Sequence, residues 1–344
     1  MSGCCKVQGA EQPRFARLEL RALAHFLSHL VPFTAYPYKG EPAACNLCGS
    51  DATLDICRKD RRWKKLGTVA CAECGLMRTQ PMPNDAELEA YYRSEYRADY
   101  QMASSAPPKF HTTRSLRDAR TRLAKLSAYI TPGQRVLDFG CGSGEFLMLA
   151  REQGCTVLGI EPGEVFARYA RETHGIDVIN APWQAVDLPE GRFDLITSNH
   201  VVEHLRAPVD AIGAMARWLA PGGALFLSVP DMRPNDRPAF ERFHFAHVHG
   251  FVPATLQAAA ARHGLVPVDG GALTDTTAIF RHTRPDERPA PLPPPGLAHA
   301  LAEGYPDASI AAYILSGRYF RAAGRRFRNW RRDTFRTANS TAGV

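Results

Sequence analysis

The chain has 344 residues, of which 45% are hydrophobic and 22% charged, the balance of an ordinary globular protein with a core of its own. No apolar run approaches the roughly 18–20 residues that a membrane span needs, and no apolar signal-peptide region follows the N-terminus. Nine cysteines without an export signal argue against a disulfide framework, so we expect a cytoplasmic protein.

The formal net charge of +7 comes from one end of the chain. Residues 318–336 contain eight arginines and a single acid, Asp333, whereas the remaining sequence is near neutral. The basic excess therefore describes a C-terminal tail and not the whole molecule.

Residues 1–40 are interpreted as a leader, and residues 41–100 as a cysteine-bearing module. This module contains two C-x-x-C-G motifs, whose cysteines are Cys45, Cys48, Cys71 and Cys74. Four thiolates make the tetrahedral shell that structural zinc prefers, and such a shell leaves no position open for a substrate. The spacing predicts a small zinc ribbon in which Zn²⁺ contributes to folding rather than to chemistry.

The segment between the two cysteine pairs is strongly basic. In "RKDRRWKKL" (58–66) six basic residues surround Trp63. Basic residues around an aromatic ring are typical of nucleic-acid binders, but also of a solvated hairpin tip. We favour the hairpin tip, because the domain that follows is not basic.

A helix is predicted over residues 84–100, with Asn84 or Asp85 as its N-cap. One stripe of this helix carries three tyrosines, Tyr92, Tyr96 and Tyr100. They either line a substrate pocket or pack on the neighbouring domain.

Residues 110–282 alternate between strand and helix patterns, which predicts an α/β domain with a doubly wound, parallel sheet. Strands are expected at 135–139, 156–161, 177–180, 192–198, 265–268 and 277–281, and a turn followed by a strand is expected over 220–230. Helices are expected at 144–154, 164–175, 253–264 and around Ile212, Met215 and Leu219.

The first strand of this domain runs into a glycine-rich loop, "VLDFGCGSGEF" (136–146). A dinucleotide site needs a third glycine one place later than Gly144, where this chain has Glu145. A carboxylate at the start of a helix would repel a pyrophosphate. The loop therefore favours S-adenosylmethionine, which has a cationic sulfonium and no phosphate. Glu161, 21 positions after Gly140, can accept hydrogen bonds from the ribose hydroxyls.

Four stretches together, "VLDFGCGSGEFL", "GIEP", "FDLITSNHVVEHL" and "LAPGGALFLSVP", resemble the successive motifs of class I S-adenosylmethionine-dependent methyltransferases. The resemblance covers about residues 115–270 and implies a Rossmann-like, seven-stranded sheet. It implies that Glu161 holds the ribose and that Asn199 lies near the methionine end. It also places His200, Glu203 and His204 beside the transfer site, although the last two could equally cap and pack a helix. The methionine-side wall that it implies consists of Asp138, Gly140, Gly142 and Gly144.

The residue that reads the adenine departs from the family pattern. Many relatives carry an acid after the third strand, where this chain has "APWQAVDLP". Gln184, a backbone group or Asp187 could read the adenine, with Trp183 as a stacking wall or as part of the core.

The cysteine module joined to this domain is similar to sugar C-methyltransferases and to methyltransferases of surface-polysaccharide pathways. By position, "FHFAHVHGF" (243–251) resembles the histidine–glutamate–histidine segment of the former, which makes His247 the base. Phe245 and Ala246 replace its other polar residues, so C-methylation is in doubt. The expected acceptor is a small molecule or sugar, such as a nucleotide sugar or polysaccharide intermediate, methylated on oxygen or carbon.

Two other functions stay open: an RNA methyltransferase that binds RNA through the cysteine module, and a non-catalytic binding module. We expect no stable nucleic-acid partner. Residues 283–344 are interpreted as a Pro-rich spacer and a basic, amphipathic helical tail that makes weak contact with anionic membranes or an acidic partner. The acceptor and the oligomeric state are not encoded in any pattern that we recognise.

Overall fold

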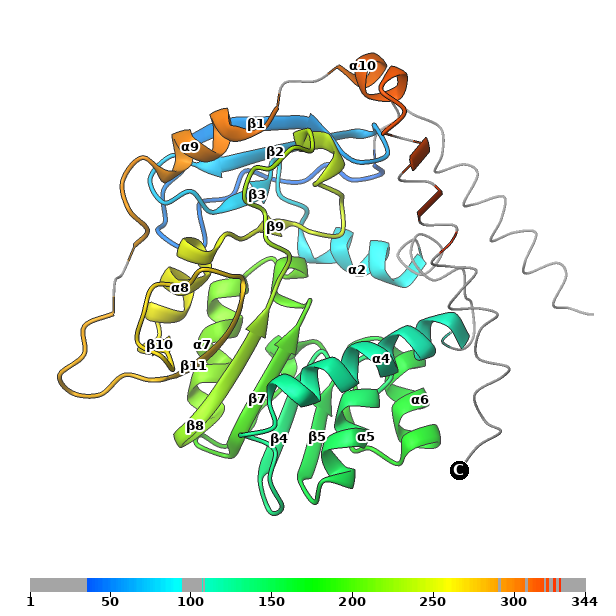
Figure 1. Ribbon diagram of the computed structural model, residues 1–344, viewed down its shortest axis with the longest axis vertical. Helices are drawn as coiled ribbons and strands as arrows, with labels where there is room; N and C mark the ends of the chain where they lie inside the picture. Colours follow the sequence, from blue (N-terminus) through cyan, green and yellow to red (C-terminus); the bar gives the residue numbers. More distant parts are fainter. Residues whose placement is uncertain are drawn as a thin grey trace, which may run out of the picture.

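The computed structural model describes residues 36–94, 107, 109–289, 292–306, 309–318, 320, 321, 324, 325 and 328. Residues 1–35 of the leader, Tyr96, Tyr100 and four of the eight tail arginines lie outside this part of the chain. Figure 1 shows two lobes, one built on a small sheet and the other on a large sheet with helices around it. No helix within the described ranges is long and apolar enough to cross a bilayer.

The large sheet has seven strands in the order β10-β11-β8-β7-β4-β5-β6. The first three strands in the chain are β4 (Arg135–Phe139), β5 (Thr156–Ile160) and β6 (Val178–Ile179). The others are β7 (Phe193–Asn199), β8 (Leu219–Ser228), β10 (Leu265–Pro267) and β11 (Thr277–His282). Each lies on or within two residues of a predicted strand, and the sheet has the predicted number of strands.

The expectation of a fully parallel sheet was wrong at β11. The strand pairs antiparallel with β8 on one side and with β10 on the other, so the sheet is mixed. Only residues 268–276 connect β10 to β11, and a link of this length cannot carry the chain back for a parallel pairing. The helical stripe was also one residue too long, because Leu219 begins β8.

Helices cover both faces of the large sheet. On one face α4 (Lys109–Lys125), α5 (Glu145–Glu152) and α6 (Glu164–His174) enclose a core with Leu126, Phe146 and Ala167. On the other face α7 (Pro208–Trp218) and α8 (Pro253–Ala261) contribute Ile212 and Leu256 to a second core. This two-sided covering is the doubly wound architecture that the alternating pattern predicts.

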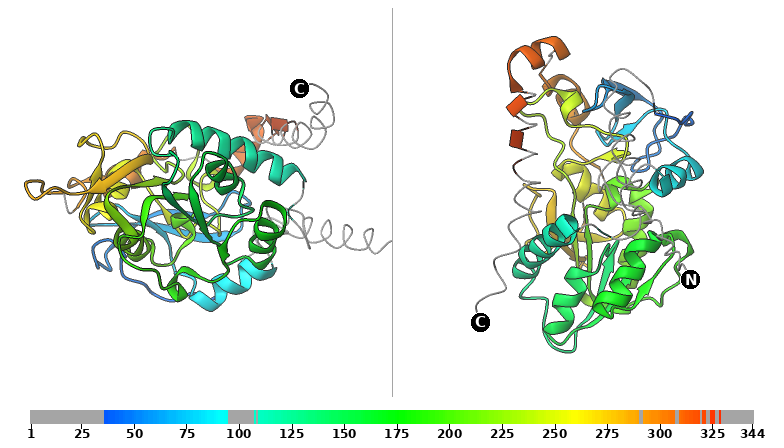
Figure 2. Two further views of the ribbon diagram at one scale, coloured as in Figure 1. Left: turned by 90° about the horizontal axis from the view of Figure 1, so that it is seen from below. Right: turned by 90° about the vertical axis from the view of Figure 1, so that its right-hand side faces the viewer.

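The small sheet has the strand order β1-β2-β3-β9. Its first three strands, β1 (Thr53–Lys59), β2 (Lys65–Cys71) and β3 (Met77–Thr79), come from the cysteine-bearing module. The fourth, β9 (His249–Gly250), comes from the segment after β8 and pairs with β3. A view turned by 90° again shows the two lobes one above the other (Figure 2). The paired β9 therefore joins the small sheet to the large-sheet domain.

Two helices flank the small sheet. The helix α2 (Asp85–Ser94) begins with a reciprocal cap, in which Asn84 Oδ1 accepts from Glu87 N at 2.9 Å and Glu87 Oε2 accepts from Asn84 N at 3.0 Å. Asn84, rather than Asp85, is thus the N-cap. The helix α9 (Leu297–Gly304) covers the sheet, where Leu301 joins a cluster with Ala70 and Met77.

Short helical segments complete the described structure. They are the 3₁₀ turns η1 (Trp183–Ala185), η2 (Val202–His204) and η3 (Ala239–Glu241), and the helix α10 (Ile310–Leu315). The predicted tail helix is interrupted at Gly317, whose φ of 68° lies in the left-handed region. Tyr313 is buried against Phe240, whereas Phe320 is 64% exposed.

Candidate functional site

All three glycines of the loop between β4 and α5 have left-handed backbone conformations, and two of them also lack room for a side chain. Gly140, Gly142 and Gly144 have φ values of 82°, 54° and 86°. A Cβ on Gly140 would lie 2.4 Å from Val201 Cγ2, and one on Gly144 would lie 2.9 Å from Ala170 Cβ. A Cβ on Gly142 meets nothing within 4 Å, so this glycine faces the open side of the loop.

Glu161 stands over this loop. Its Oε2 accepts a hydrogen bond from Gly142 N at 3.0 Å, and its Oε1 accepts one from Gly163 N at 2.8 Å. Asn180 Nδ2 donates to the Glu161 carbonyl oxygen at 2.8 Å. Two backbone N–H groups therefore hold the carboxylate beside the open glycine, and Asn180 holds the Glu161 backbone.

Asp138 is 1% exposed and lies beneath the loop, at the end of β4. The Arg122 guanidinium donates to both of its oxygens, at 2.9 and 3.0 Å, and Thr197 Oγ1 donates to Oδ1 at 2.6 Å. Arg122 comes from α4 and also lies over the Phe146 ring, 3.8 Å from its centroid. Sequence reasoning missed Arg122, because no local pattern separates it from the other arginines of its helix.

Glu145 is the first residue of α5 and is 5% exposed. Ser143 Oγ donates to its Oε2 at 2.7 Å, and burial raises the pKa of its carboxyl. Its Oε1 has no hydrogen-bond partner among the described residues. The helix N-terminus beneath the loop is thus already occupied by an acidic side chain.

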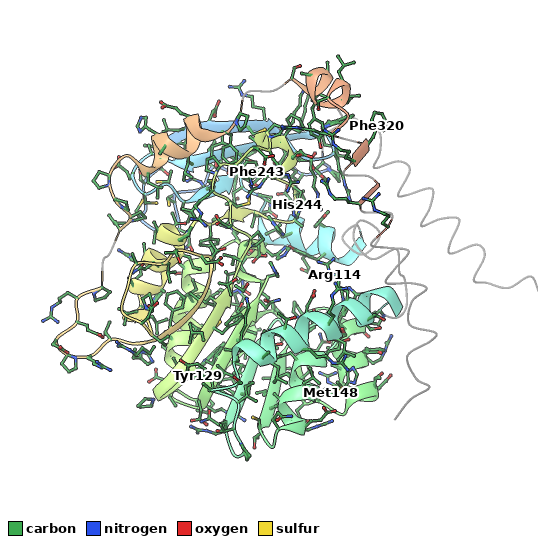
Figure 3. All side chains as sticks on the ribbon, in the orientation of Figure 1. Arg114, Tyr129, Met148, Phe243, His244 and Phe320 are labelled. Atoms are coloured by element: carbon green, nitrogen blue, oxygen red, sulfur yellow. The ribbon has the colours of Figure 1, made fainter. Side chains whose placement is uncertain are left out.

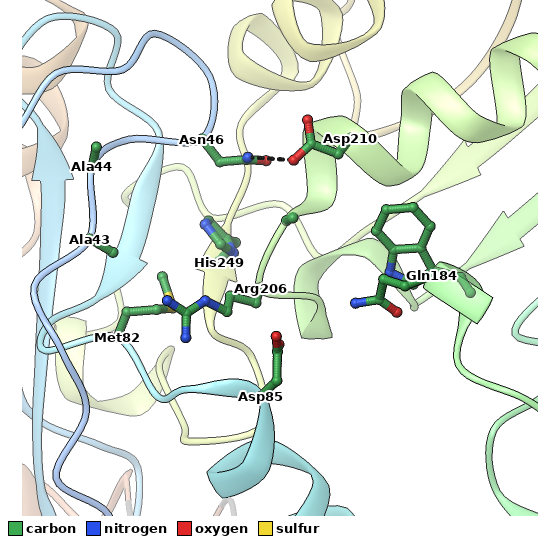
Figure 4. A pocket seen from close by; sticks show the side chains of 11 residues that line it. Ala43, Ala44, Asn46, Met82, Asp85, Gln184, Arg206, Asp210 and His249 are labelled. Carbon is green, nitrogen blue, oxygen red and sulfur yellow. Dashed lines mark hydrogen bonds between the residues drawn. The ribbon is translucent and has the colours of Figure 1, made fainter.

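Gln184 lies elsewhere. It belongs to η1 and, with Trp183, lines a cavity of about 520 Å³ between the two lobes (Figure 4). The opposite wall carries Asn46 and Arg206. Neither Glu161 nor any of the three loop glycines lines this cavity.

Asn199 and His200 end β7 at the same edge of the sheet as the glycine loop, because Thr197 pairs with Asp138 of β4. His200 has a φ of 57°, in the left-handed region, and its N–H donates to Ser228 O at 2.8 Å. The side chain of the next residue, Val201, leaves no room for a Cβ on Gly140. The loop after β7 and the glycine loop are therefore in direct contact.

A cluster of histidines surrounds Glu203 in this loop. Glu203 Oε1 lies 3.3 Å from His200 Nδ1, 3.8 Å from His204 Nε2 and 3.9 Å from His247 Nε2. Glu203 is 1% exposed, and neither of its carboxylate oxygens accepts a hydrogen bond from any described residue. We refer to His200, Glu203, His204 and His247 as the histidine cluster.

The other two histidines of "FHFAHVHGF" lie beside or behind the cluster. The His244 ring lies 3.8 Å from the His247 ring, and Figure 3 shows His244 on the side of the small-sheet lobe that faces the large sheet. His249 is 2% exposed and its Nδ1 lies 2.9 Å from Leu205 O. Burial lowers the pKa of His244 and His247 well below the usual value, and lowers that of His249 to about 4.

Tyr92 is the one tyrosine of the predicted stripe that the structure describes. Its hydroxyl lies 2.9 Å from His204 Nδ1 and donates to Ala246 O at 3.2 Å. The side chain therefore packs at the histidine cluster, between α2 and the segment after β8.

The four cysteines of the small-sheet lobe converge. Cys45 Sγ lies 3.5 Å from Cys74 Sγ, and Cys48 Sγ lies 3.4 Å from Cys71 Sγ. All four sulfur atoms lie within 4.8 Å of one another. The Cys74 hydrogen bond lowers the pKa of Cys45 to about 5 and raises that of Cys74. Four sulfurs at these separations fit a tetrahedral ion with bonds of about 2.3 Å.

Residues 110–269 match the protein family described as "Methyltransferase domain". Over 110 residues the chain is 36% identical to proteins named ubiquinone biosynthesis O-methyltransferase from Pseudomonas aeruginosa and Pseudomonas entomophila. These alignments take 30% of this chain and 47% of each relative, so the chain spans about half the length of the curated relatives it matches.

Among solved structures, a SAM-dependent methyltransferase from Archaeoglobus fulgidus superimposes with a TM-score of 0.37 and 22% identity, over 44% of this chain and 69% of that one. A second, from Mesorhizobium loti, gives a TM-score of 0.37 and 20% identity, over 47% and 95%.

Proposed function

We propose that this chain, whose residues 110–269 form a class I S-adenosylmethionine-dependent methyltransferase domain, transfers a methyl group to a hydroxyl oxygen of a small-molecule acceptor. The observation that carries the proposal is the carboxylate of Glu161 held beside the open face of Gly142. This pair forms a cradle for an adenosyl group, and the histidine cluster adjoins the loop that holds it.

In this proposal the open loop of Gly140, Gly142 and Gly144 takes the methionine part of the cofactor. Glu161 would exchange its backbone hydrogen bonds for the two ribose hydroxyls. The buried Glu145 at the start of α5 supports a phosphate-free cofactor, because a pyrophosphate there would meet a carboxylate.

Four further residues complete the proposed cofactor site. Asp138 would support the loop from below, held by its buried pair with Arg122. Asn199 and His200 would border the methionine end, since Asn199 ends β7 and His200 follows it at the edge that carries the loop. The adenine would then extend toward Gln184, although that side chain lines the cavity between the lobes.

The chemistry is an in-line displacement. The acceptor oxygen forms a bond to the methyl carbon while the bond from carbon to the sulfonium sulfur breaks, and S-adenosylhomocysteine leaves. Holding the two atoms in line supplies much of the rate enhancement. The hydroxyl proton must also be removed, and we assign this task to His247, which burial favours in its neutral form.

Oxygen is favoured over carbon as the methylated atom for two reasons. The relatives that share 36% identity are named as O-methyltransferases. Phe245 and Ala246, which replace polar residues of the sugar C-methyltransferase segment, are both buried. A sugar acceptor is compatible with this assignment. The basic hairpin tip lies close to the histidines, since Arg61 N donates a hydrogen bond to Phe243 O.

We further propose that the four cysteines bind one structural Zn²⁺. The convergence of four sulfur atoms supports a soft ion with tetrahedral geometry. When bound, the ion would stabilise the small-sheet lobe and would take no part in methyl transfer.

Titration calorimetry with S-adenosylmethionine tests the cofactor site. We expect binding to wild type, and at least tenfold weaker binding to Glu161→Ala, because two hydrogen bonds to a carboxylate are worth about 1.4 kcal/mol or more. The matched control is Glu164→Ala, whose side chain is 79% exposed on α6. Absence of binding to folded wild type would refute the enzymatic function.

A transfer assay with labelled methyl donor then tests the acceptor class. Hydroxylated small molecules, nucleotide sugars, glycolipid intermediates and RNA are compared under the same conditions. Label in RNA alone, lost steeply as salt rises, would replace this proposal with RNA methylation. Cofactor binding without transfer to any acceptor would favour a non-catalytic binding module.

A further inference from the structure

We propose that Glu203, His204 and His247 bind a divalent first-row transition-metal ion, with His200 as a fourth ligand from the exposed side. Metal binding itself follows from the geometry of the histidine cluster. The role of the ion in catalysis rests on the methyl-transfer function proposed above, and it refines the part given to His247.

The first reason is a buried carboxylate without hydrogen bonds. Glu203 is 1% exposed, and both its oxygens lack a hydrogen-bond partner among the described residues. An ionised carboxylate in such a place is costly unless a charge compensates it. A bound cation supplies that charge.

The second reason is the convergence of three imidazole nitrogens on one oxygen. His200 Nδ1, His204 Nε2 and His247 Nε2 lie 3.3, 3.8 and 3.9 Å from Glu203 Oε1. The two longer separations exceed a hydrogen bond. They slightly exceed the roughly 3.0–3.5 Å between neighbouring ligands of an ion with bonds of about 2.1 Å, so a small contraction completes the shell.

The third reason is the proton on His204. Its Nδ1 lies 2.8 Å from Ala246 O, a carbonyl that can only accept, so Nδ1 carries the proton. Nε2, which lies 3.8 Å from Glu203 Oε1, then carries the lone pair. A metal-binding histidine commonly donates its other ring N–H to a carbonyl in this way.

The donor set selects the kind of ion. Imidazole nitrogens with one carboxylate suit manganese, iron, cobalt or zinc, whereas calcium and magnesium prefer shells of oxygen only. An octahedral ion held by these four protein ligands keeps two positions open for an acceptor hydroxyl and water. Coordination there would lower the pKa of the hydroxyl, so that its proton passes to solvent and His247 holds the ion instead of taking the proton itself.

Electron paramagnetic resonance with Mn²⁺ tests the site without any turnover. The protein is used as isolated, with the cysteine site filled, and loss of the free Mn²⁺ signal is followed during titration. We expect one ion per chain, and at least tenfold weaker binding to Glu203→Gln and to His247→Gln. His299→Gln, an exposed histidine on α9, is the control and should bind as wild type does.

Circular dichroism and thermal unfolding of each variant show which of them fold. If Glu203→Gln fails that check, His247→Gln and His200→Gln decide the outcome. Wild type that binds S-adenosylmethionine but not Mn²⁺ or Co²⁺ would overturn the metal site and leave the proposed function intact. Mn²⁺ binding that both cluster variants retain would place the ion elsewhere and would also overturn it.

Discussion

At the scale of single residues, two arginine–aspartate pairs behave differently because of burial. Arg122 and Asp138 are 12% and 1% exposed, whereas Arg135 and Asp194 are 47% and 29% exposed. Both pairs are close, at 2.9 and 2.7 Å. Only the first pair has given up most of its water, so only there does the loss of one partner leave a buried, uncompensated charge.

We therefore predict that Arg122→Met lowers the free energy of unfolding by about 3 kcal/mol. Arg135→Met, the matched control, should cause a much smaller loss, because water screens its aspartate. Urea denaturation of both variants gives the comparison. Equal losses in the two variants would show that burial does not govern the Arg122 pair.

At the scale of elements, α4 is attached to the large-sheet domain by contacts at both ends. Arg122 near its C-terminal end binds Asp138, and His111 near its start packs edge-on against Phe166 of α6, with ring centroids 5.3 Å apart. Burial, with a smaller effect of the Arg114 charge, lowers the pKa of His111 to about 4. The stability of this helix's packing therefore depends on pH, because His111 is buried in its neutral form.

A histidine in an unfolded chain has a pKa of about 6.5, above that of folded His111. Its contribution to stability is thus complete above pH 6.5 and is lost as the pH falls toward 4. Between pH 7 and 4.5 we expect wild type to lose more free energy of unfolding than His111→Gln. Urea denaturation at several pH values checks this, with His299→Gln as control. Parallel curves for wild type and His111→Gln would contradict the assignment.

At the scale of the whole molecule, the small-sheet lobe and the large-sheet domain are joined by side-chain contacts and by the strand β9. Asn46, inside the first cysteine motif, accepts at Oδ1 from Val209 N at 2.8 Å and donates to Asp210 at 3.1 Å, at the start of α7. Arg206 pairs with Glu41, and β9 extends the small sheet. A disturbance of the cysteine site should therefore reach the methyltransferase domain.

We predict that Cys71→Ser abolishes zinc binding and lowers the stability of the whole chain by more than about 5 kcal/mol, since structural zinc contributes on the order of 10 kcal/mol in small domains. Cys155→Ser, outside the cluster, is the control and should keep one zinc per chain. Metal analysis and thermal unfolding followed by tryptophan fluorescence give the two readouts. Wild-type protein without zinc, or a variant that unfolds at the wild-type temperature, would refute the structural role.

The local patterns of the sequence predicted the elements and the loop. The alternation of strands and helices from β4 to β8 could be predicted because apolar residues recur with a strand period in some segments and with a helix period in others. This spacing is a property of short segments. The glycine loop and Glu161 were found for the same reason, since their chemistry lies within about 25 residues of chain. The four cysteines were found because a C-x-x-C motif already positions two ligands in one turn.

Only the tertiary structure decided which distant side chains meet. Arg122 reaches Asp138 across 16 residues, and His247 reaches Glu203 from the far side of β8. Both contacts depend on helix placement and on a loop that returns over the sheet edge, which no local periodicity encodes. Burial is likewise a property of the folded chain. Glutamate is usually found on the surface, and Glu203 is buried only because the elements packed around it exclude water from its carboxylate.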